Sequence, residues 1–294
     1  MNQLKTVLLL GVLSAILVGV GGALGPNALG VSVVLAMVMN LGAYFFSDKI
    51  VLAMHRAQEI SPAESPELHQ MVEELAASAG IPKPRVYLIP EMQPNAFATG
   101  RNPQNAVVAV TSGILQVLDR RELRGVLAHE LAHVKNRDIL VSSIAATVAA
   151  AITYVAHAVG FFGAAASDEN GPSPVQSLLL ALVAPIAATL IQLGISRSRE
   201  YGADQTGAEI SGDPEALARA LEKLDQAAHA VPASMQPATA SLFIVNPFSA
   251  TEGILNLFST HPSMRERIRR LRAMEGQIGG SPEGTRDATV RAGW

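Results

Sequence analysis

Long stretches without charge alternate with polar segments along this 294-residue chain. Residues 6–25 and 28–47 are two runs of twenty residues with no charged side chain, and only Pro26 and Asn27 separate them. A helix of about twenty apolar residues spans the hydrocarbon core of a bilayer. The pattern therefore predicts a transmembrane helical hairpin at residues 1–47. A cleaved signal peptide is the alternative for the first run, but the immediate second run favours the hairpin.

Two further uncharged runs follow in the second half of the chain. Residues 139–166 and 174–196 are uncharged apart from His157, and the seven-residue link between them carries two acidic residues but no Lys or Arg. We interpret residues 139–196 as a second transmembrane hairpin. An ionisable side chain inside a span is costly, so we expect His157 to face neighbouring helices or a polar cavity in a structural role.

Basic residues flank the two hairpins on one side only, and cytoplasmic loops of membrane proteins carry an excess of Lys and Arg. We therefore expect both termini and the polar segments in the cytoplasm, with both tight turns outside. The flanking basic residues are Lys5, Lys49, Arg56, Lys135, Arg137, Arg197 and Arg199. The expected parts are a hairpin at 1–47, a first cytoplasmic part at 48–138, a second hairpin at 139–196, a second cytoplasmic part at 197–275, and a disordered tail at 276–294.

The polar segments predict a mainly α-helical fold with a small β-sheet. Residues 65–80 have a proline at the first helical position, apolar residues at helical spacing and a terminal glycine, which is typical of an amphipathic helix. Residues 85–89 and 105–111 are short Val-rich runs bounded by Pro, Gly and Asn, and we interpret them as strands. Capping patterns predict packing helices near residues 213–224 and 263–271.

A further helix carries the main candidate chemistry. Asp119 followed by Glu122 predicts an N-cap with a capping box, and apolar residues continue at helical spacing. This helix contains His129-Glu130-Leu131-Ala132-His133. Residues four apart share one helix face, so the two imidazoles can bind one metal ion while Glu130 stays near its open side. The alternative is two ordinary histidines that flank a solvated Glu.

A catalytic zinc ion usually has three protein ligands and one open position. Glu200 is our candidate for the third ligand, and Asp204, one helical turn further on, is our candidate acceptor for a ligating histidine. The second hairpin starts shortly after His133 and ends shortly before Glu200, so it returns the chain to the same place. The alternative for Glu200 is an exposed carboxylate paired with a neighbouring Arg. We expect the site on the order of 10 Å from the bilayer surface.

Substrate contacts are expected from an exposed strand edge, because such an edge can pair with an extended peptide. We assign this role to the strand at residues 105–110, with the segment at 95–98 leading towards it. A plain structural edge strand is the alternative. The candidate substrate-binding residues are Asn95, Ala96, Phe97, Val107 and Val108.

Two other residues are candidates for stabilising an oxyanion. His261, ahead of a capped helix, could swing towards the metal site, and Tyr201 follows the third ligand. The run Arg265–Arg272 holds five Arg. Such a run is most often a solvated face and less often a contact for anionic lipid headgroups.

The predicted reaction is peptide hydrolysis, in which Glu130 takes a proton from a zinc-activated water and passes it to the leaving amine. The alternative functions are a non-catalytic zinc-binding scaffold, a metal transporter, and a protease that cuts within the bilayer. Polar residues 135–138, which follow His133, favour a surface site over a site within the bilayer.

The absence of Cys fits a cytoplasmic catalytic part. The net charge of −3 gives no indication of nucleic-acid binding.

The chain resembles the HtpX-type membrane metalloproteases of bacteria, which are related to the CAAX prenyl proteases, from Lys5 to about Leu271. The motifs that carry the resemblance are MNLGAYFFSDKI, PNAFATG, GVLAHELAHVKNRD, SRSREYGAD and STHPSMRERIRRL. The resemblance implies a gluzincin-like core with one Zn²⁺ per chain. It implies His129, His133 and Glu200 as metal ligands and Glu130 as the catalytic residue. It also implies a multi-pass protein of the bacterial inner membrane that degrades misfolded or damaged membrane proteins under stress.

Overall fold

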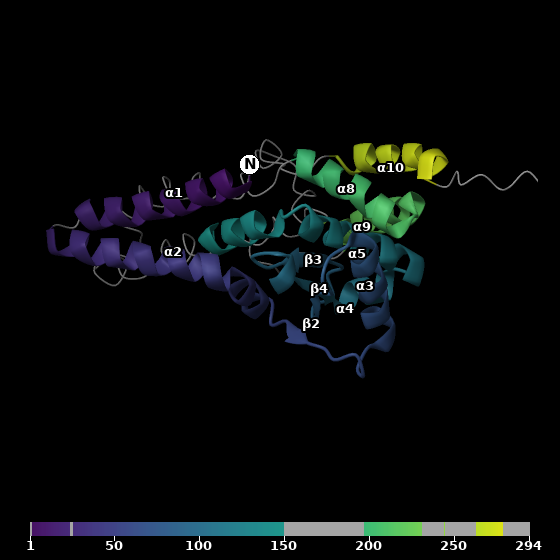
Figure 1. The fold of residues 1–294 in the computed structure, drawn as a ribbon, viewed down its shortest axis with the longest axis horizontal. Helices are drawn as coiled ribbons and strands as arrows, with labels where there is room; N and C mark the ends of the chain where they lie inside the picture. The colour runs from purple at the N-terminus through teal and green to yellow at the C-terminus, as the bar shows by residue number, and fades with distance from the viewer. Residues whose placement is uncertain (1, 24–25, 150–196, 231–243, 245–262, 279–294) are drawn as a thin grey trace, which may run out of the picture.

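The computed structural model describes residues 2–23, 26–149, 197–230, 244 and 263–278 (Figure 1). Most of the expected second hairpin, with His157, lies outside these residues. His261 and the expected tail from residue 279 onwards lie outside them too. The described part is mainly helical with one small mixed sheet, as the sequence predicts.

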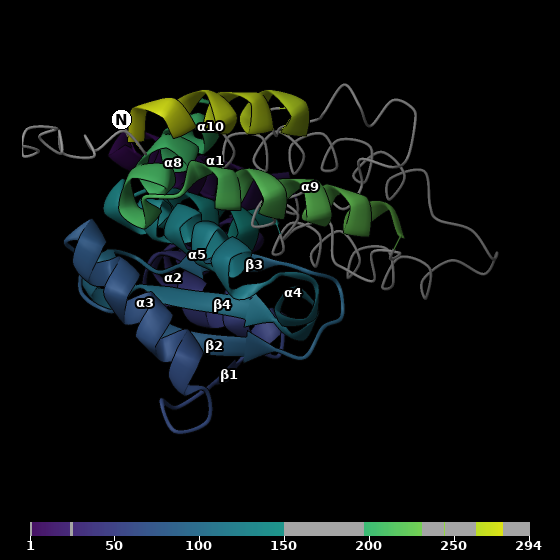
Figure 2. The same cartoon turned by 90° about the vertical axis from the view of Figure 1, so that its right-hand side faces the viewer.

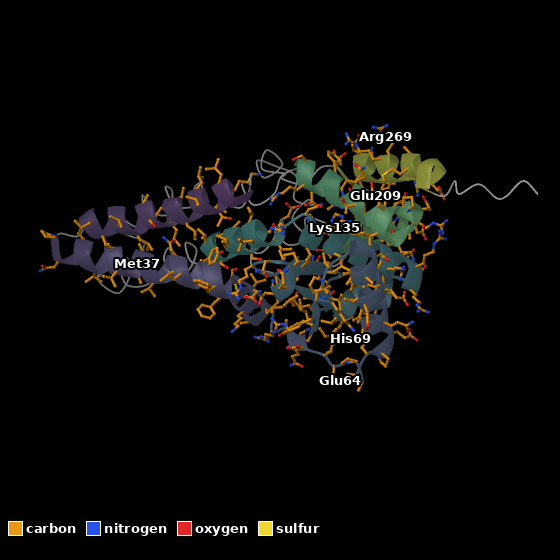
Figure 3. The ribbon with its side chains drawn as sticks, in the orientation of Figure 1. Met37, Glu64, His69, Lys135, Glu209 and Arg269 are labelled. Carbon is orange, nitrogen blue, oxygen red and sulfur yellow. The ribbon has the colours of Figure 1, made fainter. Side chains whose placement is uncertain are left out.

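Two long apolar helices form an arm that extends from the body of the protein (Figure 1). They are α1 (Asn2–Ala23) and α2 (Pro26–Met54), and they lie side by side, with Asn40 donating a 2.6 Å hydrogen bond to Ser14 Oγ. The side chains around Met37 are almost entirely carbon (Figure 3). Leu4, Val31 and Val7 are 72%, 69% and 66% exposed. Outward-facing apolar residues of this kind fit a lipid environment better than water.

Within the described part of the chain, one helix is long and apolar enough to cross a membrane, at Leu29–Met54. The apolar stretches at Leu4–Gly19 and Ile139–Ala149 are shorter. α2 continues seven residues beyond the end that we expected at residue 47. The reason is packing, because Val51 and Leu52 at its carboxyl end are buried against the sheet.

The sheet has four strands in the order β1-β2-β4-β3. β2 and β4 are parallel, with Arg85 opposite Val107, while β1 and β3 join antiparallel to β2 and β4, respectively. β4 is therefore an interior strand, and β1 and β3 are the two edge strands. Our expectation that the strand at 105–110 offers its edge to a peptide is wrong. The strands are β1 (Gln58–Glu59), β2 (Arg85–Ile89), β3 (Ala96–Thr99) and β4 (Val107–Thr111).

Both faces of the sheet are covered, which explains the continuous apolar run in β4. Val108 and Val110 point into the core formed with α3 (Pro66–Ala79) and α5 (Arg120–Lys135). Val107 and Ala109 pack on the opposite face, against the carboxyl end of α2. Alternate residues of a strand face opposite sides, so a strand that is buried on both sides is apolar over most of its length.

α5 is the central helix of the body. Figure 2 shows α10 (Met264–Ile278), then α8 (Arg197–Ser211) and α9 (Pro214–Ala230), then α5, stacked above the sheet. The helices predicted after residues 65, 119, 213 and 263 are all present, together with a short α4 (Ser112–Val117). Because α5 touches the sheet on one side and α8 on the other, it carries its side chains into the space between them.

Candidate metal centre

The start of α5 sets the positions of the residues that follow on it. The Asp119 side chain accepts hydrogen bonds of 2.9 Å from the backbone N–H groups of Arg121 and Glu122, and Glu122 accepts one of 2.9 Å from the Asp119 backbone. This is the capping box that the sequence predicts. Because the helix begins at a defined residue, His129 and His133 project from the same face at a fixed orientation.

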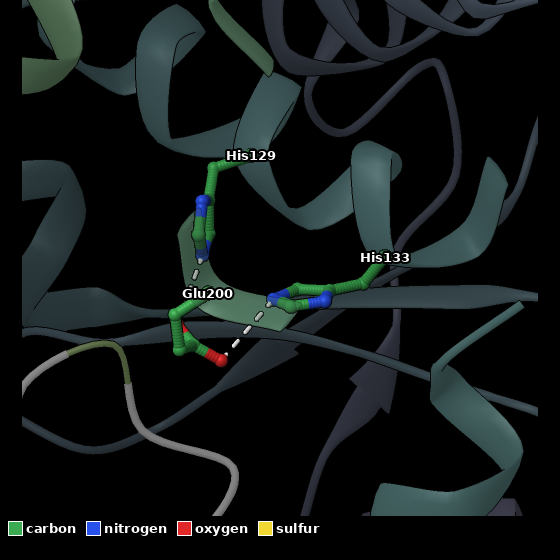
Figure 4. A group of neighbouring side chains, drawn as sticks. All are labelled: His129, His133 and Glu200. Carbon is green, nitrogen blue, oxygen red and sulfur yellow. Dashed lines mark ion pairs between the residues drawn. The ribbon is translucent and has the colours of Figure 1, made fainter. Parts of the chain in front are cut away.

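Glu200 on α8 lies opposite the two histidines of α5, as Figure 4 shows. Its carboxylate oxygens are 3.6 Å from His129 Nε2 and 3.7 Å from His133 Nε2. One ligand atom from each of the three residues lies within 4.8 Å of the others. The structure therefore brings together the three residues that we predicted as metal ligands from the sequence.

These distances fit a single bound cation. Bonds of about 2.1 Å from imidazole nitrogen and carboxylate oxygen, arranged tetrahedrally, place ligand atoms roughly 3.4 Å apart. The two observed separations exceed this by a few tenths of an ångström, which small side-chain rotations correct. Glu200 is 12% exposed and His133 is 16% exposed, so one side of the group remains open.

Each histidine has a carboxylate next to its second ring nitrogen. His129 Nδ1 lies 3.0 Å from Asp204 Oδ1, and His133 Nδ1 lies 3.5 Å from Asp138 Oδ2. A carboxylate in this position sets the tautomer and orientation of a metal-ligating imidazole. Asp204 is where we expected such an acceptor, but we did not anticipate Asp138. Asp138 reaches the ring because the chain turns after α5, where Arg137 has φ of 59°.

Arg267 on α10 is fully buried beside Asp204. Its Nε and Nη2 donate hydrogen bonds of 2.8 and 2.7 Å to the two carboxylate oxygens of Asp204, and Nη1 donates one of 3.3 Å to the Ile244 carbonyl. Its Nη2 also lies 3.4 Å from His129 Nε2. Pairing with Asp204 offsets the positive charge that would otherwise oppose a cation at this place.

The expected solvated face on α10 therefore needs a correction. Arg267 belongs to the Arg265–Arg272 run that we assigned to solvent, yet it is 0% exposed. Arg269, 71% exposed, does follow the expectation. Arg267 and Arg269 differ in exposure because residues two apart on a helix face different directions.

The electrostatics of the group favour bound positive charge. Burial lowers the pKa of His129, but the neighbouring carboxylates of Asp204 and Glu200 outweigh this and raise the pKa to about 9. Burial raises the pKa of Glu200, yet the two histidines and Arg267 hold it well below its ordinary value. Burial raises the pKa of the Asp204 carboxyl, but Arg267 outweighs this effect and lowers the pKa to about 2. Both carboxylates are thus ionised at neutral pH.

Glu130 lies on the same helix as the two histidines and is buried. Its Oε2 accepts a hydrogen bond of 2.9 Å from the backbone N–H of Ala98 on β3. Burial raises the pKa of Glu130, and the positive charges of His129 and His133 oppose this. A carboxyl with a raised pKa is better able both to take and to return a proton near neutral pH.

A small cleft opens over these residues. Its walls come from β3, α5, α8 and the helical stretch that begins at Ile139. The residues that line it are Phe97, Ala98, His129, Glu130, His133, Ile139, Ser142, Arg199, Glu200 and Ile244.

Four of the five candidate substrate-binding residues do not line this cleft. Val107 and Val108 are buried in the interior strand, and Ala96 is 0% exposed in β3. Asn95 is also buried, and its Oδ1 accepts a hydrogen bond of 3.2 Å from the Ile244 backbone N–H. Asn95 thus supports a residue of the cleft wall, while Phe97 lines the cleft itself.

Tyr201 takes a position that differs from our expectation. Its ring lies 3.8 Å from the guanidinium of Arg270, and it lines a separate hollow between α8 and α10. One residue after Glu200, a helical side chain is rotated by about 100° away from the ligand face. A role for Tyr201 in stabilising an oxyanion is therefore not supported by its position.

The match to known proteins agrees with this geometry. The family model described as peptidase family M48 matches residues 62–275, which contain every residue of the site. The chain belongs to peptidase family M48. As an M48 member it is a metallopeptidase, and its substrates are proteins or peptides.

Several curated relatives of this M48 peptidase carry the description "Protease HtpX homolog". The relative from Syntrophobacter fumaroxidans is 57% identical over 281 residues, which cover 93% of this chain and 99% of the relative. The relative from Sulfurihydrogenibium sp. is 55% identical, with 92% and 95% covered. The relative from Methylibium petroleiphilum is 51% identical, with 94% and 99% covered.

Among solved structures, the crystal structure of S. mikatae Ste24p is similar to this M48 peptidase with a TM-score of 0.47 and 20% sequence identity. The similar region covers 81% of this chain and 57% of that chain. This chain therefore spans little more than half the length of Ste24p.

Proposed function

We propose that this M48 peptidase is a membrane-embedded, zinc-dependent endopeptidase with its active site at the cytoplasmic face. The observation that carries the proposal is the placement of His129, His133 and Glu200 around one point, with Glu130 beside it in an open cleft. Two imidazoles and one carboxylate form the ligand set of many catalytic zinc sites, where a fourth position stays open for water or substrate.

A bound zinc ion would supply a Lewis acid that acidifies a water molecule and polarises the scissile carbonyl. His129, His133 and Glu200 would hold this ion, while Asp204 and Asp138 keep the imidazole rings in position. Glu130 takes the proton of the attacking water and later donates it to the leaving amine. The Ala98 N–H holds one Glu130 oxygen, so the carboxylate does not rotate away from the cleft.

We place the peptide substrate along β3. This strand is an edge strand of the sheet, and the Ala98 N–H, on the side away from β4, points to Glu130. An extended peptide can pair with such an edge through main-chain hydrogen bonds, which tolerates many sequences. Phe97 and Ile244 give the cleft apolar walls, so apolar side chains suit the positions next to the scissile bond.

The membrane assignment is supported by the apolar arm and by the positions of the basic residues. The outward-facing apolar side chains of α1 and α2 fit a bilayer, and Leu29–Met54 is long enough to span it. The positive-inside rule places both hairpin ends, residues 48–138 and residues 197–275 in the cytoplasm. Together with the resemblance to HtpX-type proteases, this supports a bacterial inner-membrane protein with damaged or misfolded membrane proteins as substrates.

The proposal is tested on protein purified in detergent with a chelator and then supplied with zinc. Wild type should bind one zinc ion per chain and cleave casein. Glu130→Gln should bind the same amount of zinc while its cleavage rate falls by a factor of about 10² to 10⁴. His133→Ala should lose both. Glu209→Gln changes an exposed carboxylate on α8 and is the matched control, with wild-type activity expected.

Cleavage by Glu130→Gln at the wild-type rate would remove the catalytic assignment and favour a zinc-binding scaffold. A second measurement separates surface cleavage from cleavage within the bilayer. Substrates with one membrane span are cut, and the cleaved bonds are mapped. The polar residues 135–138 that follow His133 predict cleaved bonds outside the span, and cleaved bonds only at mid-span would contradict this prediction.

A further inference from the structure

Two arginines reach the metal centre, and they differ in their partners. The guanidinium of Arg267 is engaged by both oxygens of Asp204 and by the Ile244 carbonyl. Arg199, directly before Glu200 on α8, lines the cleft beside the ligands. The Nε and Nη1 atoms of Arg199 are shielded from solvent, and within the described ranges they have no hydrogen-bond partner.

An incompletely paired guanidinium in such a place is costly. Burial of a charged group without hydrogen-bond partners is strongly unfavourable, and native structures normally avoid it. The nearby carboxylates do not remove the cost. Asp138 and Glu200 act on Arg199 through space. Asp138 forms an ion pair with His133, and Glu200 forms ion pairs with both ligating histidines and Arg267.

The position of Arg199 next to the metal site is given by the cleft lining. Its backbone is adjacent to that of Glu200 on α8, and its side chain lines the same cleft as the ligand. Its side chain keeps partial exposure, and the cleft is open. A group that enters the cleft can therefore approach the exposed part of this side chain, and an oxygen acceptor is the chemistry that its guanidinium lacks.

We propose that Arg199 is a substrate-binding residue that donates hydrogen bonds to an oxygen acceptor of the peptide next to the scissile bond. This inference rests on the proposed peptidase function of the cleft. The acceptor is either a main-chain carbonyl of an internal segment or the carboxylate of a peptide end. Arg suits both, because its planar fork offers several N–H groups in fixed directions.

Binding is measured without cleavage, in zinc-loaded Glu130→Gln protein, so that the result does not depend on activity. Fluorescent peptides of the same sequence are titrated in two forms, with a free and with an amidated carboxyl end. Arg199→Lys and Arg199→Gln are each added to the Glu130→Gln background. Arg269→Gln, an exposed arginine of α10 outside the cleft, is the matched control (Figure 3).

We expect Arg199→Gln to raise the Kd about tenfold to hundredfold, which is the range for a hydrogen bond to a charged group. Arg199→Lys should weaken binding less, because it keeps the charge and loses the fork. Equal weakening for both peptide forms indicates a carbonyl acceptor. Weakening confined to the free acid indicates a carboxylate.

Unchanged Kd values in both Arg199 variants would overturn the proposal. Zinc content and melting temperature are recorded for each variant, and the conservative Arg199→Lys variant keeps the test valid if Arg199→Gln is unstable. Steady-state kinetics in the active background give a second readout. A raised KM with little change in kcat supports substrate binding, while a fall in kcat alone contradicts it. Failure of the wild type to cleave any peptide would instead refute the proposed function.

Discussion

Gly207 on α8 lies directly against the backbone of His129 on α5. A β-carbon at residue 207 would come within 2.8 Å of His129 Cα and within 2.9 Å of its backbone nitrogen. The two helices therefore cross at a distance that only glycine permits. Since Glu200 lies two turns earlier on the same helix, this close crossing is what brings its carboxylate to the histidines.

Gly207→Ala should separate α8 from α5 and weaken the metal centre. Forcing an extra methyl group into such a contact typically costs about 1–3 kcal/mol of stability. We expect a lower melting temperature, weaker zinc binding and reduced cleavage. Gly202→Ala is the matched control, because no atom lies within 4 Å of a β-carbon there and helix propensity favours alanine by up to about 1 kcal/mol. Equal zinc affinity in the two variants would contradict this account.

Arg267→Met should destabilise the protein strongly. It leaves Asp204 as an uncompensated buried charge, for which the expected cost is about 3–5 kcal/mol. Loss of the partner that holds Asp204 should also lower zinc affinity about tenfold to hundredfold. Chemical denaturation and zinc titration measure the two effects. The double variant Asp204→Asn/Arg267→Met should recover stability but not zinc affinity, and the exposed Arg269→Met should match wild type in both.

Metal-free protein should lose stability as the pH rises from 6.5 through 9. Burial lowers the pKa of His129, but Asp204 and Glu200 raise it to about 9, above the value of 6.5 that it has in an unfolded chain. Protonation of His129 therefore stabilises the metal-free fold fully below pH 6.5, and this contribution disappears as the pH passes 9. Zinc needs the unprotonated nitrogen, so its affinity should rise over the same interval.

Thermal melting of chelator-treated protein and zinc titrations across this interval measure the two opposite trends. The Asp204→Asn variant lacks the carboxylate that stabilises protonated His129, so its melting temperature should fall less as the pH rises. A melting temperature that rises with pH in metal-free wild type would show that His129 is neutral in the fold.

Ala98→Pro should impair catalysis while the sheet stays intact. The Ala98 N–H faces Glu130 and not β4, so proline removes the bond to the carboxylate without removing a bond of the sheet. We expect kcat to fall about tenfold to hundredfold, as for loss of a hydrogen bond to a charged group. Ala98→Gly keeps the N–H and is the control. A proline variant with wild-type kcat would mean that Glu130 needs no such support.

The local part of the site was predictable from the sequence. The capping box at Asp119 and the apolar spacing after it define a helix, and the helix alone determines that His129 and His133 share a face. Glu200 required one further step, the expectation that an apolar hairpin returns the chain to its starting side. All of these inferences use spacing along the chain, which the sequence contains.

The order of the strands was not predictable in the same way. β3 has four residues and β1 has two, and such short strands carry no recognisable alternation. The Val-rich run of β4 was visible, but an apolar strand can lie at the edge or in the interior, and only its neighbours decide. For this reason the substrate edge was assigned to β4 and not to β3.

Arg267 was missed for a related reason. It is one of five arginines within eight residues, and nothing in their spacing distinguishes the buried one. Its burial depends on Asp204, which lies 63 residues earlier on another helix. Asp138 was overlooked because a turn after α5, and not helical spacing, carries it back to His133. Tertiary pairing of this kind has no local signal.

The residues of the site are spread from Ala98 to Arg267, and this has a consequence for synthesis of the protein. A ribosome releases the chain from its amino end, so the helix with His129 and His133 emerges long before Glu200 and Arg267. The nascent chain cannot assemble a working centre until nearly all of it has been translated. Newly made copies therefore lack a complete centre until translation is nearly finished.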